Sequence, residues 1–158
     1  MQTNPALTVL NAVSPLDGRY AARCDALRPL LSEAGFMAHR VEVEIAWLIG
    51  LSQAGLPELP PFSIGATQVL HSLVADFSEA DADRIKQIER TTNHDVKAVE
   101  YWLKEKVAGH PELEKAGEFI HFACTSEDIN NTSHALMLGR AREQVVVPQL
   151  QKVLASLQ

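Results

Sequence analysis

The sequence has few cysteines and no long apolar run. Its two cysteines, Cys24 and Cys124, do not form a C-x-x-C pair, so a reduced, cytoplasmic protein is the simplest expectation. No apolar run approaches the roughly 18 residues that a membrane-spanning helix needs. The first ten residues lack the basic segment and the long apolar segment of a secretion signal. A membrane is therefore not expected as a partner.

Basic residues are also scarce. The formal net charge is −6 and no block of Lys or Arg is present, which argues against nucleic-acid binding. The 158 residues are 46% hydrophobic and 22% charged, as in an ordinary globular protein of one domain or slightly more. An acidic chain of this kind can still bind a small anion in a local positive pocket.

Helical periodicity covers most of the chain and no convincing strand pair is found, so the predicted fold class is all-α. Helices are predicted within 23–55, 64–77, 79–88 and 93–109, and from 125 onward. Gly109-His110-Pro111 opposes helix continuation and is the best candidate for a domain boundary. His39 and Arg40 are expected to be solvated. The residues expected on the apolar face of 64–77 are Ile64, Val69, Leu73, Val74 and Phe77.

The stretch 89–101 has the highest density of polar groups. Thr92 and Asp95 have the spacing of a capping box, which predicts a helix start near Asn93. An apolar stripe follows, made of Val96, Val99, Leu103 and Val107. His94, Lys97 and Tyr101 share a different face. A capped, solvated amphipathic helix would explain this pattern, but a polar helix start can also bind an anion.

Two other segments allow the same two interpretations. The turn 14–18 is followed directly by Arg19 and Tyr20, which could be a surface arginine and a half-buried tyrosine, or a clamp for phosphate. Thr125 and Asp128 also fit a capping box. Thr125 and Ser126 could be helix caps only, or could donate to a bound carboxylate or phosphate.

Three motifs resemble the adenylosuccinate lyases of the fumarase/aspartase superfamily. They are S-P-L-D-G-R-Y at 14–20, T-T-N-H-D-V-K-A-V-E-Y at 91–101 and E-F-I-H-F-A-C-T-S-E-D-I-N-N at 118–131, and they occur in the family's order. The resemblance implies an N-terminal helical substrate-binding domain (1–111) and the truncated start of a central long-helix bundle (112–158).

The resemblance also implies an activity. These lyases eliminate fumarate from adenylosuccinate, giving AMP, and from SAICAR, giving AICAR, with no metal or organic cofactor, and they assemble as homotetramers. The family pattern implies substrate contacts at Arg19, Tyr20, Asn93, His94, Asp95, Thr125 and Ser126. His94 would act mainly through its electrostatic effect, with an auxiliary role in proton transfer as the alternative. Asn130 and Asn131 are expected to line the site or bridge helices.

The motifs on which the family places its acid and base, T-x-H-G-x-x-A and S-S-x-M-P-x-K-x-N-P, are absent from the sequence. The 158-residue chain alone is therefore expected to be inactive. Its last helix carries an apolar stripe of Val147, Leu150, Val153, Leu154 and Leu157, which favours a truncated chain or a stripe covered by partner helices. The alternative is a short non-catalytic module that binds a nucleotide or another protein.

Overall fold

The computed structural model describes residues 8–158, and every regular element in that range is a helix. The elements in chain order are η1 (Ala21–Leu27), α1 (Arg28–Leu31), α2 (Glu33–Gln53), α3 (Ile64–Ala75), α4 (Glu79–Thr92), α5 (Asp95–Val107), η2 (Gly117–Phe119), α6 (Ser126–Ala141), η3 (Arg142–Val146) and α7 (Val147–Ser156). η1 and η2 are 3-10 helices, and η3 is a π-helical turn. The all-α prediction is confirmed.

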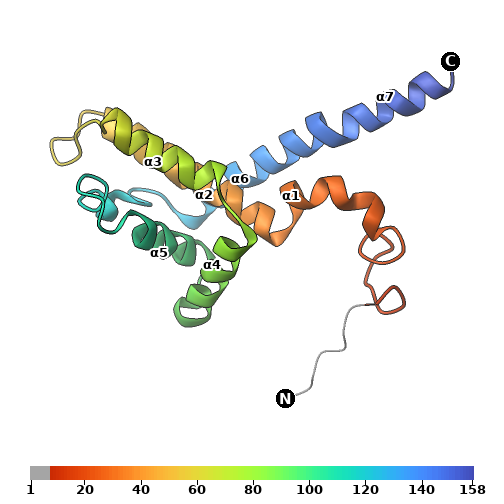
Figure 1. Cartoon of the computed structure of the whole chain (residues 1–158), viewed down its shortest axis with the longest axis horizontal. Helices are drawn as coiled ribbons and strands as arrows, with labels where there is room; N and C mark the ends of the chain where they lie inside the picture. Colours follow the sequence, from red (N-terminus) through yellow and green to blue (C-terminus); the bar gives the residue numbers. More distant parts are fainter. Residues whose placement is uncertain (1–7) are drawn as a thin grey trace.

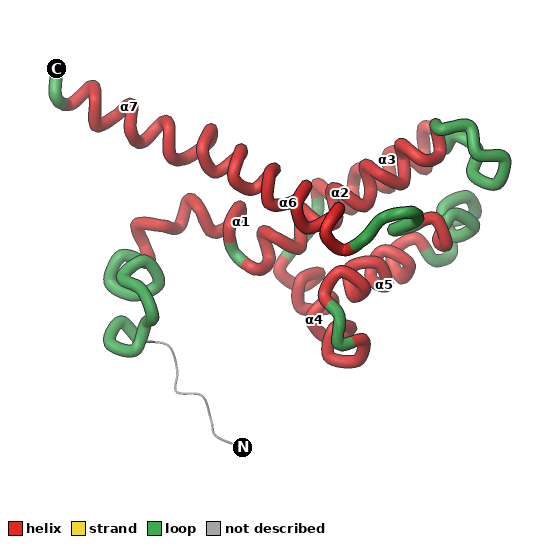
Figure 2. Tube along the Cα trace, turned by 180° about the vertical axis from the view of Figure 1, so that it is seen from behind, coloured by secondary structure: helices red, strands yellow, loops and turns green. Residues whose placement is uncertain are grey.

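Five helices pack around α2 (Figures 1 and 2). It contacts α1, α3, α4, α5 and α6. Its start is fixed by Ser32, whose hydroxyl accepts a hydrogen bond from the Gly35 N–H at 3.2 Å. Because neighbours cover α2 from several sides, it buries polar positions as well as apolar ones.

The main core lies between α2, α3, α4 and α5. Trp102 of α5 is 1% exposed and forms an edge-to-face pair with Phe77, at 5.5 Å between ring centroids. The predicted apolar stripe of α5 is confirmed, because Val96, Val99, Leu103 and Val107 are all buried. Leu113, Ala116 and Ile120, from the segment after α5, complete the same core. The domain boundary after residue 111 stays a prediction.

Two predictions about exposure are wrong. Ile64 is 81% exposed and Val69 is also at the surface, whereas the buried apolar residues of α3 are Ala66 and Leu70. His39 and Arg40 are each only 3% exposed. The physical reason for the second error is the central place of α2, which leaves little of its circumference open to water.

The last helices form a continuous rod that extends away from the packed body (Figure 1). α6 passes into α7 through the π-helical turn η3. Pro148, near the start of α7, has no N–H to donate to a preceding carbonyl, which accounts for an irregular turn at this place. The five residues of the predicted apolar stripe of α7 are all exposed. Among residues 8–158, no helix has the length and apolar character needed to cross a membrane.

Candidate functional site

The starts of α5 and α6 meet on one side of the packed body. His94 precedes α5, Ser126 begins α6, and His94 Nε2 lies 3.5 Å from Ser126 Oγ. We call His94, Asp95, Thr125 and Ser126 the α5–α6 junction. The start of each helix carries about half a positive charge, so the junction is suited to binding an anionic group.

Asn93 ends α4 and does not begin the next helix. Its φ is 51°, in the left-handed region, and its N–H donates to the Glu89 carbonyl oxygen at 2.7 Å. Thr92 is the last residue of α4, and its hydroxyl donates to the His94 carbonyl oxygen at 3.1 Å. α5 begins at Asp95, within two residues of the predicted start near Asn93, but the predicted Thr92–Asp95 capping box is wrong. Asn tolerates left-handed backbone better than most residues, so this position has a structural function; a substrate contact from Asn93 stays a prediction.

His94 caps α5 in place of Thr92. Its Nδ1 accepts a hydrogen bond from the Lys97 N–H at 3.2 Å. A ring nitrogen that accepts carries no proton, so the proton of the neutral imidazole is on Nε2, the atom that faces Ser126. This geometry favours a hydrogen-bond donor with an electrostatic role over a base at Nε2. Contact with substrate stays a prediction for His94.

Asp95 is held from two sides. Its Oδ1 accepts from the Val96 N–H at 2.9 Å, and its Oδ2 accepts from Nη2 of the buried Arg40. Burial acts to raise the pKa of the Asp95 carboxyl, but the hydrogen bond from Val96 and the charge and hydrogen bond of Arg40 outweigh it, so the pKa lies below its usual range. The charge of Asp95 is thus balanced within the protein, which favours a supporting role at the junction.

The start of α6 is capped as predicted. The Thr125 N–H donates to Asp128 Oδ2 at 2.7 Å, and the Thr125 hydroxyl donates to the same oxygen at 2.8 Å. These two bonds from Thr125 lower the pKa of the Asp128 carboxyl. The Thr125 hydroxyl donates its hydrogen within the box, so the Ser126 hydroxyl is the one better placed to donate to a ligand.

Arg19 and Tyr20 lie far from the α5–α6 junction. The turn that carries them lies beyond α1, and both views show it well separated from the place where α4, α5 and α6 meet (Figures 1 and 2). The turn is closed by hydrogen bonds from the Ser14 N–H to Asp17 Oδ1 at 2.9 Å and from the Tyr20 N–H to the Pro15 carbonyl oxygen at 2.9 Å. Both side chains are exposed, with the Arg19 guanidinium 4.8 Å from the Tyr20 ring centroid. One chain does not bring all the predicted contacts together.

Sequence patterns did not indicate a buried pair formed by Glu44 and His121. Glu44 is fully buried in α2, and its Oε1 lies 2.6 Å from His121 Nδ1. Burial raises the pKa of the Glu44 carboxyl, and the hydrogen bond with His121 acts against that rise. His121 and Ala123 both have left-handed backbone, with φ of 63° and 59°, in the segment that leads to Thr125. Sequence motifs and periodicity describe neighbouring residues, so they do not predict a contact between two positions 77 residues apart.

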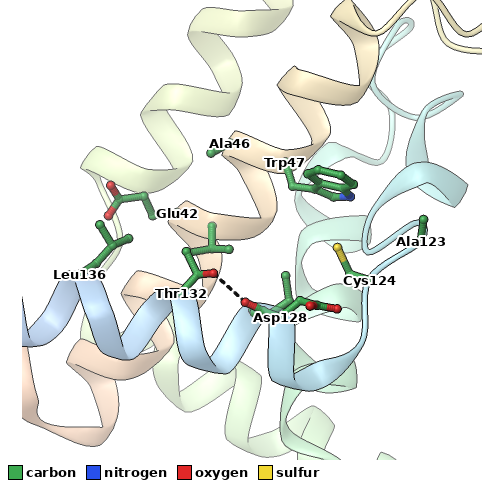
Figure 3. Close-up of a pocket in the computed structure, with 10 residues that line it drawn as sticks. Glu42, Ala46, Trp47, Ala123, Cys124, Asp128, Thr132 and Leu136 are labelled. Atoms are coloured by element: carbon green, nitrogen blue, oxygen red, sulfur yellow. Dashed lines mark hydrogen bonds between the residues drawn. The ribbon is translucent and has the colours of Figure 1, made fainter.

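An apolar cavity of about 660 Å³ lies between α2 and α6 (Figure 3). Trp47 and Cys124 lie at one end and Leu136 at the other. The Trp47 indole N–H donates to the Phe122 carbonyl oxygen at 2.8 Å, and burial raises the pKa of the Cys124 thiol. None of the predicted substrate-contacting residues lines this cavity. Within residues 8–158, no three His, Cys, Asp or Glu side chains are grouped as metal ligands would be.

A family model described as "Lyase" matches residues 18–158. The chain belongs to this lyase family. The motifs at 91–101 and 118–131 lie wholly within the matched range, and the motif at 14–20 overlaps it at 18–20, so the resemblance that they carry is confirmed at the level of the family.

Individual relatives of this lyase family are adenylosuccinate lyases. The chain is 59% identical over 152 residues to adenylosuccinate lyase of Vibrio cholerae, covering 96% of the chain and 33% of that relative. It is 60% identical over 149 residues to the Haemophilus influenzae protein of the same name, covering 94% of the chain and 33% of the relative. Against the Escherichia coli K12 adenylosuccinate lyase, the identity is 60% over 143 residues, or 90% of the chain and 31% of the relative. The chain thus spans about a third of the length of the curated relatives that it matches.

Proposed function

We propose that this chain is the substrate-binding N-terminal part of an adenylosuccinate lyase. The complete protein would release fumarate from adenylosuccinate, leaving AMP, and from SAICAR, leaving AICAR. The observation that supports this most is the α5–α6 junction, where residues 32 apart in sequence approach to 3.5 Å. Two motifs that resemble the lyase motifs thereby supply polar groups to one place.

The proposed reaction is a β-elimination. A base removes a proton from the carbon beside a carboxylate, and the charge that builds on this carboxylate needs fixed hydrogen-bond donors. The carbon–nitrogen bond then breaks, the double bond of fumarate forms, and an acid protonates the departing nitrogen. No metal or organic cofactor takes part in this scheme.

The residues of this chain would bind and orient the substrate. The planar guanidinium of Arg19 would donate two parallel hydrogen bonds to the phosphate, and the hydroxyl of Tyr20 would donate a third. Ser126, with the free N–H groups of α6, would donate to a carboxylate, and His94 would add its Nε2–H. The acid and the base would come from outside these 158 residues, so the chain alone would be inactive.

The complete enzyme would be a cytoplasmic homotetramer. Arg19 and Tyr20 lie apart from the α5–α6 junction in one chain, so a substrate that contacts both sets would be bound by residues of two copies. The exposed apolar stripe of α7 supports the same proposal, because it is suited to packing against helices of neighbouring subunits.

The decisive experiment is a coupled pair of measurements. The first is the intact mass of the polypeptide carrying S-P-L-D-G-R-Y in its source cells, and the second is fumarate release from adenylosuccinate by that purified polypeptide. A mass well above 17.4 kDa together with activity supports the proposal. A mass near 17.4 kDa without activity would contradict it and favour a short module that binds a nucleotide or another protein.

A further inference from the structure

Arg40 connects the two helices that form the α5–α6 junction. Its side chain, on α2, is only 4% exposed. Nη2 donates to Oδ2 of Asp95, the first residue of α5, and Nε donates to Oδ1 of Asn130, in α6, at 2.9 Å. One guanidinium is therefore bonded to the first residue of α5 and to the second turn of α6. Asn130 thus bridges helices, one of the two roles expected from the sequence.

The guanidinium is also held in one orientation by its packing. Its central carbon lies 3.8 Å from the centroid of the Phe36 ring. Phe36 in turn stacks on His134 of α6, with ring centroids 4.4 Å apart and planes 17° apart. Val43, Val96 and Ile129 form a buried apolar cluster where α2, α5 and α6 meet. A planar, stacked cation with two fixed partners loses little further freedom when a ligand binds nearby.

The charge of Arg40 matters as much as its shape. Asp95 places a carboxylate beside the two helix starts, and an unbalanced carboxylate there would repel an anionic ligand. Arg40 balances this charge from the interior, so the Nε2–H of His94 and the hydroxyl of Ser126 remain available to an anion. Arg40 is too deeply buried to touch that anion itself.

We propose that Arg40 is the positioning residue of the α5–α6 junction. It sets the separation of His94 and Ser126 and neutralises Asp95, so that these two side chains bind one carboxylate or phosphate group of the substrate together. This inference rests on the proposed lyase function for the identity of the substrate, and on the contacts of Arg40 for the positioning itself.

The test compares Arg40→Lys with Arg140→Lys in the complete protein. Arg140 is a matched control, because it also joins α6 to α2, through two hydrogen bonds of 2.6 Å to Glu42, and it lies at the other end of α6 from the junction. We expect Arg40→Lys to raise the KM for adenylosuccinate by about tenfold or more, since displaced binding groups lose affinity steeply. Arg140→Lys should leave KM within about twofold. Melting temperatures of both variants show whether any loss of stability is comparable.

An equal rise of KM in both variants, or no rise in either, would overturn the positioning role. An inactive wild-type protein would instead refute the proposed function, and the role of Arg40 would then be decided by crystal structures of the wild-type and Arg40→Lys chains. A separation of His94 Nε2 and Ser126 Oγ that widens beyond the wild-type value supports the inference. An unchanged separation in the variant overturns it.

Discussion

Gly35 lies directly against the backbone of Pro29. A Cβ atom placed on Gly35 would be 2.7 Å from the Pro29 carbonyl oxygen and 2.9 Å from the Leu30 carbonyl carbon. Real Cβ atoms do not approach backbone atoms so closely, so only glycine permits this packing. The contact sets how α1 meets the first turn of α2.

Gly35→Ala should therefore destabilise the chain. The backbone of α1 has to move to admit the methyl group, and overpacking of this kind costs about 1–3 kcal/mol. Gly50→Ala is the control, since Gly50 is exposed in the same helix and a Cβ atom added there would meet nothing within 4 Å. The Gly50→Ala variant should gain about 0.5–1 kcal/mol in its free energy of unfolding, because alanine has the higher helix propensity. Urea denaturation of both variants measures the difference; equal stabilities would contradict the close packing at Gly35.

The Glu42–Arg140 ion pair should make stability depend on pH in the acid range. The hydrogen bonds from Arg140 lower the pKa of the Glu42 carboxyl. The ion pair therefore adds to the free energy of unfolding at pH values above the pKa of Glu42 in the unfolded chain. This contribution is lost as the pH falls through the lower pKa of Glu42 in the folded chain. Because both side chains are partly exposed, we expect Glu42→Gln to cost about 1 kcal/mol or less at neutral pH. Denaturant titrations across the acid range should show this cost disappearing, and a cost independent of pH would contradict the assignment.

Glu44 should show the opposite sign, although it lies only two residues away. Burial raises the pKa of its carboxyl, against the opposing hydrogen bond with His121. A carboxyl whose pKa is raised by folding stabilises the folded chain at pH values below its pKa in the unfolded chain. This contribution is lost as the pH rises through its pKa in the folded chain. Glu44→Gln does not titrate, so its stability relative to wild type should improve as pH rises. The same titrations test this, with Glu42→Gln as the control of opposite slope.

Asn93→Ala should lower stability through the backbone. An alanine in left-handed conformation costs roughly 1–2 kcal/mol, whereas glycine accepts it without a Cβ clash. Asn93→Gly should consequently be the more stable of the two variants in thermal denaturation. If Asn93→Ala were as stable as Asn93→Gly or more stable, the end of α4 would adopt another conformation in solution.

Arg19→Lys should weaken substrate binding in the complete enzyme. An ammonium group cannot reproduce the two parallel donors of a guanidinium, so KM for adenylosuccinate should rise. Arg23→Lys is the control, since Arg23 is an exposed arginine of η1 for which no role is predicted. Steady-state kinetics distinguishes the two, and an unchanged KM in Arg19→Lys would refute the phosphate clamp.

Most of the helix limits could be predicted from the sequence, because they depend on neighbouring residues. The Thr125–Asp128 box lies where its spacing indicated, Ser78 and Asp81 form a box of the same spacing at the start of α4, and Gly55 and Gly109 follow helix ends in left-handed conformation. The Thr92–Asp95 box failed because the His94 imidazole supplies the cap instead. A ring nitrogen is not among the usual capping groups, so the spacing of Thr92 and Asp95 was misleading.

The interior of the junction could not be predicted in this way. Arg40 is bonded to partners 55 and 90 residues away, so its burial depends on how three helices come together. One local signal was available, since Phe36 and Arg40 are four residues apart and share a helix face. The path of the chain through η1 and α1 likewise separates Arg19 from His94, and no sequence motif indicates this separation.

The intrinsic fluorescence of Trp47 and Trp102 reports on two different parts of the chain. These are its two tryptophans: Trp102 is 1% exposed in the main core, whereas Trp47 is 39% exposed beside the α2–α6 cavity. Emission from Trp102 would follow melting of the helical body. Emission from Trp47, tied by its indole N–H to the segment before α6, would follow rearrangements next to the junction. Spectra of a Trp47→Phe and a Trp102→Phe variant would therefore separate loss of the fold from motion at the site.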